Sequence, residues 1–407
     1  MPSDRDGLLK HGLWLFAATQ IANACNLFFH VVMGRGLPPA EYSALSTLLN
    51  IMLVIGTPLE ALRTSIAHFA AKASATGETG MLRPVIRSWS IKLLAVGLPL
   101  SLAGCAGSAW IAAYFHLPTV WPVIIMSLTI TGLLFIPLLA GALQGVQAFG
   151  WMALSLQGLS VVRLGLGWLL IATWSVTALS GVIAQFVGVA LALAIGFAGL
   201  ARILPRSMTS TAEDAVGSYF SKALIMLAGY AVLMNMDIVL VRHYFVEESK
   251  MFAQAATISR SIIFLPMPIA LAMFPKVIGS ESGRSTFLKA LAIVFALVAG
   301  GVAACLLIPQ VPLQLMYKNS DPEAIRMVRL VILAMSPLGL TYLLMNYEMA
   351  RHRFRAGIPL AVCAITYVGG VMLWHNRIEN VITMLAIATV SSLLVFLAGR
   401  PWREDGV

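Results

Sequence analysis

Charged residues are scarce in this chain. Only 11% of its 407 residues are Asp, Glu, Lys or Arg, whereas soluble domains average about 25%. The mean hydropathy is +0.88, and 59% of the residues are hydrophobic. A soluble globule could not cover its surface with so few polar groups. The composition therefore excludes a cytosolic enzyme, a disordered chain and a secreted disulfide scaffold, and it predicts an all-α polytopic membrane protein surrounded by lipid.

Cysteines and nucleotide motifs are also few. The four cysteines lie far apart in apolar runs, without a CxxC or Cys/His cluster, so we expect no disulfide and no metal site. No GxxxxGK[ST] loop is present, so ATP is not expected to be the direct energy source. No connection is long enough for an extramembrane catalytic domain, which argues against an enzyme.

Long apolar runs make up most of the chain. About twelve runs reach the roughly 20 residues needed to cross a bilayer, and they lie at 12–33, 43–71, 91–113, 121–147, 152–174, 178–200, 219–245, 251–275, 286–308, 326–348, 356–375 and 380–399. The longest connection, about 201–218, is charged. We therefore predict an N-terminal lobe with spans 1–6 (residues 1–205) and a C-terminal lobe with spans 7–12 (residues 206–407).

The distribution of basic residues predicts the orientation. If the N-terminus is cytoplasmic, 17 of the 27 Lys and Arg fall on the cytoplasmic side and 7 outside. Cytoplasmic loops collect Lys and Arg, so both termini are expected in the cytoplasm. The net charge of +10 then reflects membrane topology, and no nucleic-acid partner is expected.

The two lobes carry a weak internal repeat. Pro58 and Pro268 are 210 residues apart, and so are Tyr42 and Phe252, which open the same spans. An even number of spans in each lobe makes this a parallel repeat, as in transporters built from two six-helix halves.

A few ionisable residues lie inside the predicted spans, where a charge costs a few kcal/mol. The bases and acids of this set are Arg63, Arg163, Arg260, Glu60, Asp237 and Glu348. One interpretation is a cationic, water-filled cavity. The other is internal pairing, since Glu60 and Arg63 are three residues apart on one helix and Glu348 lies beside Arg351 at a helix end.

Asp237 shares span 7 with Asn235. Its carboxylate is a candidate for H⁺ or Na⁺ coupling or for gating; the alternative is a salt bridge that holds the lobe together. No other cofactor is expected.

Span 1 carries a polar stripe. Thr19, Asn23, Asn26 and His30 fall on one helical face. Such a face lines either a cavity, which we favour, or a hydrogen-bonded helix contact. In span 6, small residues recur every four positions (Ala184, Gly188, Ala192 and Gly196), which predicts close helix packing.

Prolines interrupt spans 2 and 8. Pro58, Pro266 and Pro268 each remove a backbone donor. In transporters, broken helices at matching positions of the two halves point to the substrate path. We interpret these prolines as candidate hinges; a merely kinked, packed helix is the alternative.

Several segments resemble one family. The segment Phe29–Tyr42 (FHVVMGRGLPPAEY) resembles the first loop of polysaccharide biosynthesis proteins, the oligosaccharide flippases of the multidrug/oligosaccharidyl-lipid/polysaccharide (MOP) exporter superfamily. Ala142–Gln147 (ALQGVQ) is similar to the end of their fourth span, and Asn235–Phe245 (NMDIVLVRHYF) to their seventh. Arg260, followed by Ile263–Pro266 and Phe274–Lys276, resembles their eighth.

The resemblance implies a MATE-like architecture of two six-helix lobes and a multi-pass protein of the inner membrane of a prokaryote. It implies a flippase that moves a lipid-linked, diphosphate-bearing oligosaccharide or polysaccharide precursor by alternating access. Arg63, Arg260, Arg163, Asn23 and Asn26 are then the candidate substrate-binding residues. The expected partners are membrane lipids, the lipid-linked glycan and the polymerase and glycosyltransferase machinery.

Some features depart from the family. Twelve spans leave out the two extra helices of lipid II flippases, and span 1 carries amides in place of the acid that drug-exporting relatives often use. Two alternatives stay open: a cation-coupled multidrug or metabolite exporter of the same superfamily, and a membrane enzyme or assembly factor of envelope glycan synthesis.

Overall fold

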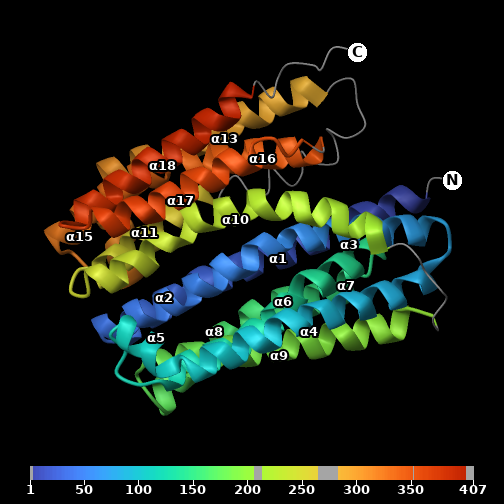
Figure 1. Cartoon of the computed structure of the whole chain (residues 1–407), viewed down its shortest axis with the longest axis horizontal. Coiled ribbons are helices and arrows are strands. Elements are labelled where there is room, and N and C mark those ends of the chain that lie inside the picture. The colour runs from blue at the N-terminus through green and yellow to red at the C-terminus, as the bar shows by residue number, and fades with distance from the viewer. Residues whose placement is uncertain (1–2, 206–212, 265–282, 352, 400–407) are drawn as a thin grey trace. The chain divides into compact units, whose positions relative to one another are not determined.

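The computed structural model describes residues 3–205, 213–264, 283–351 and 353–399, and every regular element within those ranges is a helix (Figure 1). The chain forms two compact units, Met1–Ser221 (unit 1) and Lys222–Val407 (unit 2). The expected lobe boundary at 205/206 precedes this division, which falls inside helix α10 (Glu213–Tyr244).

Unit 1 is built from long helices joined by short turns. Its elements are α1 (Ser3–Gly36), α2 (Pro39–Gly56), η1 (Thr57–Leu59), α3 (Glu60–Ala75), η2 (Thr79–Met81), α4 (Leu82–Ala106), α5 (Ser108–Tyr114), α6 (Trp121–Gly145), α7 (Phe149–Met152), η3 (Ala153–Gln157), α8 (Gly158–Thr173) and α9 (Ala178–Ile203).

Unit 2 contains most of α10 and the helices that follow it. These are α11 (Ser249–Ile263), α13 (Gly283–Leu307), α14 (Gln310–Tyr317), α15 (Pro322–Met335), α16 (Pro337–Ala350), α17 (Gly357–Leu373) and α18 (Ile378–Ala398).

The helices match the predicted spans. Within the described residues, nine helical segments are long and apolar enough to cross a membrane, and they coincide with predicted spans 2–7, 9, 10 and 12. Predicted spans 1 and 11 correspond to α1 and to the shorter apolar helix α17, and the first part of span 8 corresponds to α11. The all-α fold class is therefore confirmed.

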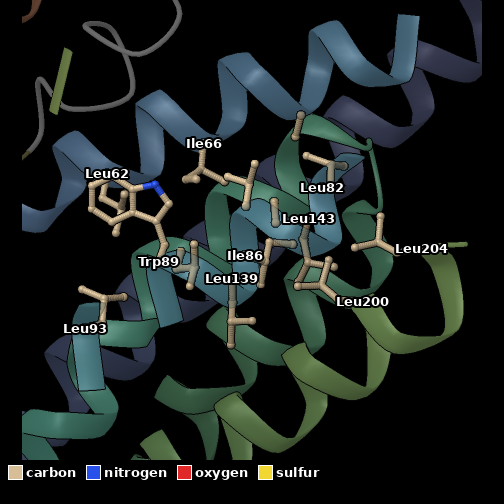
Figure 2. Packing of buried hydrophobic residues seen from close by; sticks show 14 of the residues in the cluster. Leu62, Ile66, Leu82, Ile86, Trp89, Leu93, Leu139, Leu143, Leu200 and Leu204 are labelled. Carbon is tan, nitrogen blue, oxygen red and sulfur yellow. The ribbon is translucent and has the colours of Figure 1, made fainter. Parts of the chain in front are cut away.

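Helix α6 lies at the centre of unit 1, where it packs against α3, α4 and α9. Glycines allow this close approach: a Cβ at Gly141 would lie 2.5 Å from the carbonyl oxygen of Arg63 on α3. Larger side chains fill the space further along (Figure 2), in a cluster that includes Leu62, Ile66, Ile86, Trp89, Leu139, Leu143 and Leu200. The packing of α6 on α3 fixes the position of the polar groups on both helices.

The small residues of α9 do form a packing face, as predicted. Ala184, Gly188, Ala192 and Gly196 are all buried. A Cβ at Gly188 would lie 3.3 Å from the carbonyl oxygen of Leu159 on α8. This face therefore lets the backbones of α8 and α9 approach closely.

Two helices of unit 1 contain irregular turns. The 3₁₀ turn η1 surrounds the buried Pro58 between α2 and α3, so the predicted interruption of span 2 is present. The π-helical turn η3 lies between α7 and α8, and it places the Ser155 hydroxyl 2.7 Å from the carbonyl oxygen of Ala192. Pro266 and Pro268 lie outside the described residues.

The helices of the two units follow the same order. Helices α2 and α11 begin 210 residues apart, and α4 and α13, α6 and α15, α8 and α17, and α9 and α18 begin 199 to 201 apart. Tyr42 and Phe252, the pair that suggested the repeat, are both fully buried. The offset shortens by about ten residues after the second helix, which is why only the first spans repeat at 210.

Candidate functional site

Arg163 lies inside unit 1, on α8, among groups from two other helices. Its guanidinium donates to the amide oxygens of Gln185 on α9 at 2.9 Å and Asn26 on α1 at 2.8 Å. The guanidinium carbon lies 4.4 Å from the centre of the Phe29 ring, an arrangement in which the face of the ring attracts the cation.

The partners of Arg163 are neutral. Among the described residues, no acidic side chain forms an ion pair with it, and its buried Nε has no hydrogen-bond partner. The amide oxygens orient the guanidinium without cancelling its charge. The arrangement of Asn26, Phe29, Arg163 and Gln185, which we call the Arg163 cluster, therefore retains one positive charge within the apolar helices of unit 1.

The polar stripe of span 1 contacts the segment that contains Arg163. Gln157 of η3 donates to the Thr19 hydroxyl at 3.3 Å, and Asn26 accepts from Arg163. Asn23 is exposed and donates to Gln20 at 3.2 Å. The stripe thus makes a polar helix contact at Thr19 and Asn26, whereas Asn23 does not take part in that contact.

Arg63 lies on α3 and is 31% exposed. It donates to Glu60 at 3.2 Å, which is the pairing that the spacing allowed, and to Gln144 at 3.2 Å. Gln144 belongs to the ALQGVQ motif, whose Gly145 packs against Ala70 of α3. Gly145 therefore lets α6 approach α3 closely enough for the Gln144 amide to reach Arg63. The sequence did not predict this contact, because residues 81 apart in the chain give no local signal.

Asp237 and Arg260 meet inside unit 2. The Arg260 Nη2 atom donates to Asp237 Oδ1, and its Nε donates to the Met234 carbonyl oxygen at 2.8 Å. The two side chains are 0% and 8% exposed. The sequence singled out both residues separately, and the structure brings them together as a buried ion pair between α10 and α11.

Three buried polar atoms in the described part of this unit have no use in hydrogen bonding. Asp237 Oδ2, Asn235 Oδ1 and the Tyr367 hydroxyl are buried and have no hydrogen-bond partner among the described residues. The Tyr367 phenol on α17 is close enough to both Asp237 and Arg260 for electrostatic interaction. We call Asp237, Arg260 and Tyr367 the Asp237 cluster. Tyr367 was not predicted, because a single tyrosine in an apolar run carries no sequence signal.

Charged residues at two helix ends have buried or aromatic contacts that were not predicted. Glu348 pairs with Arg353 at 3.9 Å, and Arg351 donates to the Tyr347 hydroxyl at 3.0 Å. Arg242, near the outer end of predicted span 7, is 1% exposed in the last turn of α10. It donates to the Ser249 hydroxyl at 3.3 Å, so it joins α10 to the start of α11.

No group of three or more His, Cys, Asp or Glu side chains that could hold a metal ion occurs in the part of the chain that the structure describes. The candidate sites are therefore the Arg163 cluster and Arg63 in unit 1 and the Asp237 cluster in unit 2.

Comparison with known proteins yields similarity at the level of structure. No protein-family model and no curated protein sequence matches the chain. The chain is similar to an inward-facing multidrug resistance MATE family transporter of the MOP superfamily, with a TM-score of 0.71 and 13% identity over 95% of this chain and 97% of that one.

Two further solved structures are similar over nearly the whole chain. The lipid II flippase MurJ, in an inward closed conformation, gives a TM-score of 0.69 at 13% identity over 95% of this chain and 87% of that one. A MOP superfamily transporter from Pyrococcus furiosus gives 0.63 at 15% identity, over 95% and 92% of the two chains. The chain is thus a multi-pass membrane protein with the fold of MOP superfamily transporters.

Proposed function

We propose that this protein is an alternating-access transporter that moves a lipid-linked, anionic saccharide across the cytoplasmic membrane of a prokaryote. Similarity in fold to MOP superfamily transporters over 95% of the chain supports the transport class. The solved structures include both a multidrug transporter and a lipid flippase, so the choice of substrate depends on the charges of this chain's own site residues.

The observation that carries the proposal is the positive charge retained by the Arg163 cluster. Its arginine is held by amide oxygens and an aromatic ring, without a carboxylate among the described residues. A cation in apolar surroundings is costly unless an anion accompanies it. A guanidinium binds phosphate through paired hydrogen bonds, so a phosphate-bearing lipid headgroup is the substrate class that suits this charge.

Arg63 is the second candidate for contact with substrate. Its partial exposure leaves it accessible, and its ion pair with Glu60 is itself exposed, where such pairs contribute at most about 1 kcal/mol. An incoming phosphate can therefore replace Glu60 at little cost. Asn23, exposed on α1, is a candidate for hydrogen bonding to the sugar.

The alternative, a cation-coupled multidrug or metabolite exporter, has one observation in its favour. Asp237 is a buried carboxylate with an unused oxygen, which could accept a proton or Na⁺. Its other oxygen is already paired with Arg260, so coupling would require that pair to open. Coupling of this kind is also compatible with transport of the anionic saccharide.

The test is transport by the purified chain in proteoliposomes. A fluorescent prenyl-diphosphate saccharide is placed in both leaflets, and its movement is followed by chemical quenching of the outer leaflet. We expect faster exchange between leaflets than in protein-free vesicles. Exchange no faster than in those vesicles, together with uptake or efflux of a cationic dye, would favour the exporter.

A matched pair of variants tests whether Arg63 contributes to the exchange of lipid between leaflets. Arg63→Gln is expected to slow exchange about tenfold or more, because a charged hydrogen bond to phosphate contributes about 1.5–3 kcal/mol. Arg326→Gln is the control, since Arg326 also pairs with a glutamate three residues earlier and is exposed. Equal rates in both variants and the wild type would remove Arg63 from the substrate path.

The proposal also includes the orientation expected from the Lys and Arg residues and the hinges expected from the prolines. Both termini lie in the cytoplasm, and Pro58, Pro266 and Pro268 act as hinges. Polymerase and glycosyltransferase machinery supplies or consumes the saccharide. Cysteines placed near either terminus, tested with a membrane-impermeant thiol reagent in spheroplasts, would report the orientation.

A further inference from the structure

Unit 1 has a groove on its surface where α4 begins and α9 ends. Its volume is about 780 Å³, and its lining residues come from the first three turns of α4 and the last two turns of α9. Arg83 joins the two helices, because it donates to the carbonyl oxygens of Ala201 at 3.3 Å and Leu204 at 2.9 Å. These contacts hold the groove in shape.

The groove changes character along its length. Arg83 and Arg87 line the end nearest the start of α4, whereas Ile91 and Phe197 line the other end and are 59% and 39% exposed. From Arg83 to Lys92 the helix advances about 14 Å at 1.5 Å per residue. That distance covers the headgroup layer, roughly 5–7 Å thick on each side, and the beginning of the hydrocarbon core.

The lining carries positive charge. Arg83, Arg87 and Lys92 line the groove, and none of its lining residues is acidic. Arg87 is exposed and forms no ion pair with a described residue. The hydroxyls of Ser88 and Ser90 also line the groove, so donors for an anion stand directly above an exposed apolar surface.

We propose that this groove binds one anionic phospholipid, with its phosphate at Arg87, near the end that Arg83 lines, and its acyl chains along Ile91 and Phe197. A phospholipid needs both ends of the groove. Cations at headgroup depth attract its phosphate, and the apolar end contacts its acyl chains. The site lies within unit 1, apart from the Arg163 cluster, and binding there does not depend on what the protein transports.

The test measures lipid retained by the full-length protein. After delipidation, the protein is titrated with phosphatidylglycerol or phosphatidylcholine in detergent micelles, and bound lipid is counted by native mass spectrometry. We expect one phosphatidylglycerol at concentrations where phosphatidylcholine is absent. Arg87→Gln should lower the affinity about fivefold, while Arg87→Lys should keep most of it.

Matched controls separate the groove from general surface charge. Arg202→Gln removes an exposed cation at the same end of α9, where Arg202 lies over the Trp151 ring and does not line the groove. It should leave binding unchanged. Ala201→Trp adds bulk to an exposed position in the groove without altering charge, and it should lower retention at least tenfold.

Several results would overturn the proposal. The first is that the protein retains phosphatidylglycerol and phosphatidylcholine equally. The second is that Arg202→Gln lowers the affinity for phosphatidylglycerol as much as Arg87→Gln does. The third is that Ala201→Trp retains as much phosphatidylglycerol as the wild type. Competition by 10 mM inorganic phosphate alone would indicate a free-anion site in place of a lipid site. An unchanged elution volume and helical content in each variant would exclude misfolding as the cause of a loss.

Discussion

Each unit holds an arginine among its helices, half-buried in unit 1 and buried in unit 2, and the two are surrounded differently. In unit 1, Arg163 is held by two neutral amides and the Phe29 ring. In unit 2, Arg260 is held by the carboxylate of Asp237 and the carbonyl oxygen of Met234. The first arrangement leaves a net positive charge, whereas the second is neutral.

Under the proposed function, this difference gives the two residues different tasks. A charge that is oriented but not neutralised attracts an anion from outside the cluster. A neutralised pair instead holds two helices together, and it changes only when the carboxylate takes up a proton or the arginine finds another partner. The Arg163 cluster is therefore better suited to attract substrate, and the Asp237 cluster to control conformation.

The largest expected effect is loss of the carboxylate in unit 2. Asp237→Ala leaves Arg260 charged and unpaired in the interior, which costs about 3–5 kcal/mol. The free energy of unfolding in mixed detergent micelles measures this cost. The double variant Asp237→Leu with Arg260→Met should recover most of the loss, because no unpaired charge remains. Purely additive costs would contradict an interaction between the two side chains.

A smaller effect is expected from removing the arginine of unit 1. Arg163→Leu leaves the amide oxygens of Asn26 and Gln185 without their donor, at a cost of about 1–3 kcal/mol. The same unfolding measurement applies. The cost should be below that of Asp237→Ala, because the groups left behind are neutral. A larger cost would mean that an anion absent from the described contacts normally pairs with Arg163.

The difference between the two units can be removed by placing a carboxylate beside Arg163. Asn26→Asp should change stability by less than about 1 kcal/mol, since a stronger hydrogen bond offsets the cost of burying the acid. It should also slow the transport of an anionic lipid about tenfold, because the cluster becomes neutral. Gln20→Glu is the matched control on the same helix, because Gln20 is exposed and accepts a hydrogen bond from Asn23. Equal transport by the two variants would argue against Arg163 as the attracting charge.

The smallest effect is expected at Asn50, which occupies in α2 the position that Arg260 has in α11, 210 residues later. Asn50 donates to the Ser46 carbonyl oxygen at 2.7 Å, and its own oxygen is buried without a partner. Asn50→Leu should alter the free energy of unfolding by no more than about 1 kcal/mol, since the unpaired oxygen offsets the lost hydrogen bond. A cost above about 2 kcal/mol would show that the oxygen is paired in the membrane.

Most of the fold could be predicted from the sequence. Apolar runs of about 20 residues and small residues every four positions are local signals, and both the spans and the packing face of α9 follow from them. The irregular turn at Pro58 was also predictable, because proline removes a backbone donor.

The partners within each cluster were not predictable. Asp237 and Arg260 were recognisable as costly charges, but their pairing depends on how α10 and α11 pack. Gln144, Gln185 and Tyr367 are single polar residues in apolar helices, and nothing in their local sequence indicates which side chain they contact. Arg242 falls near the end of predicted span 7, but its contact with Ser249 depends on how α10 and α11 pack.

The π-helical turn η3 also has an evolutionary consequence. Such a turn holds one residue more than the α-helical turn it replaces, so it is equivalent to a single-residue insertion between Trp151 and Arg163. Because the extra residue is taken up within this one turn, deleting one residue from 153–157 would give an ordinary α-helical turn and leave the helix on either side close to its present orientation. Trp151 and Arg163 would then keep their neighbours, and the main loss would be the contact of Ser155 with Ala192. An ancestor without the insertion could therefore already have carried the Arg163 cluster.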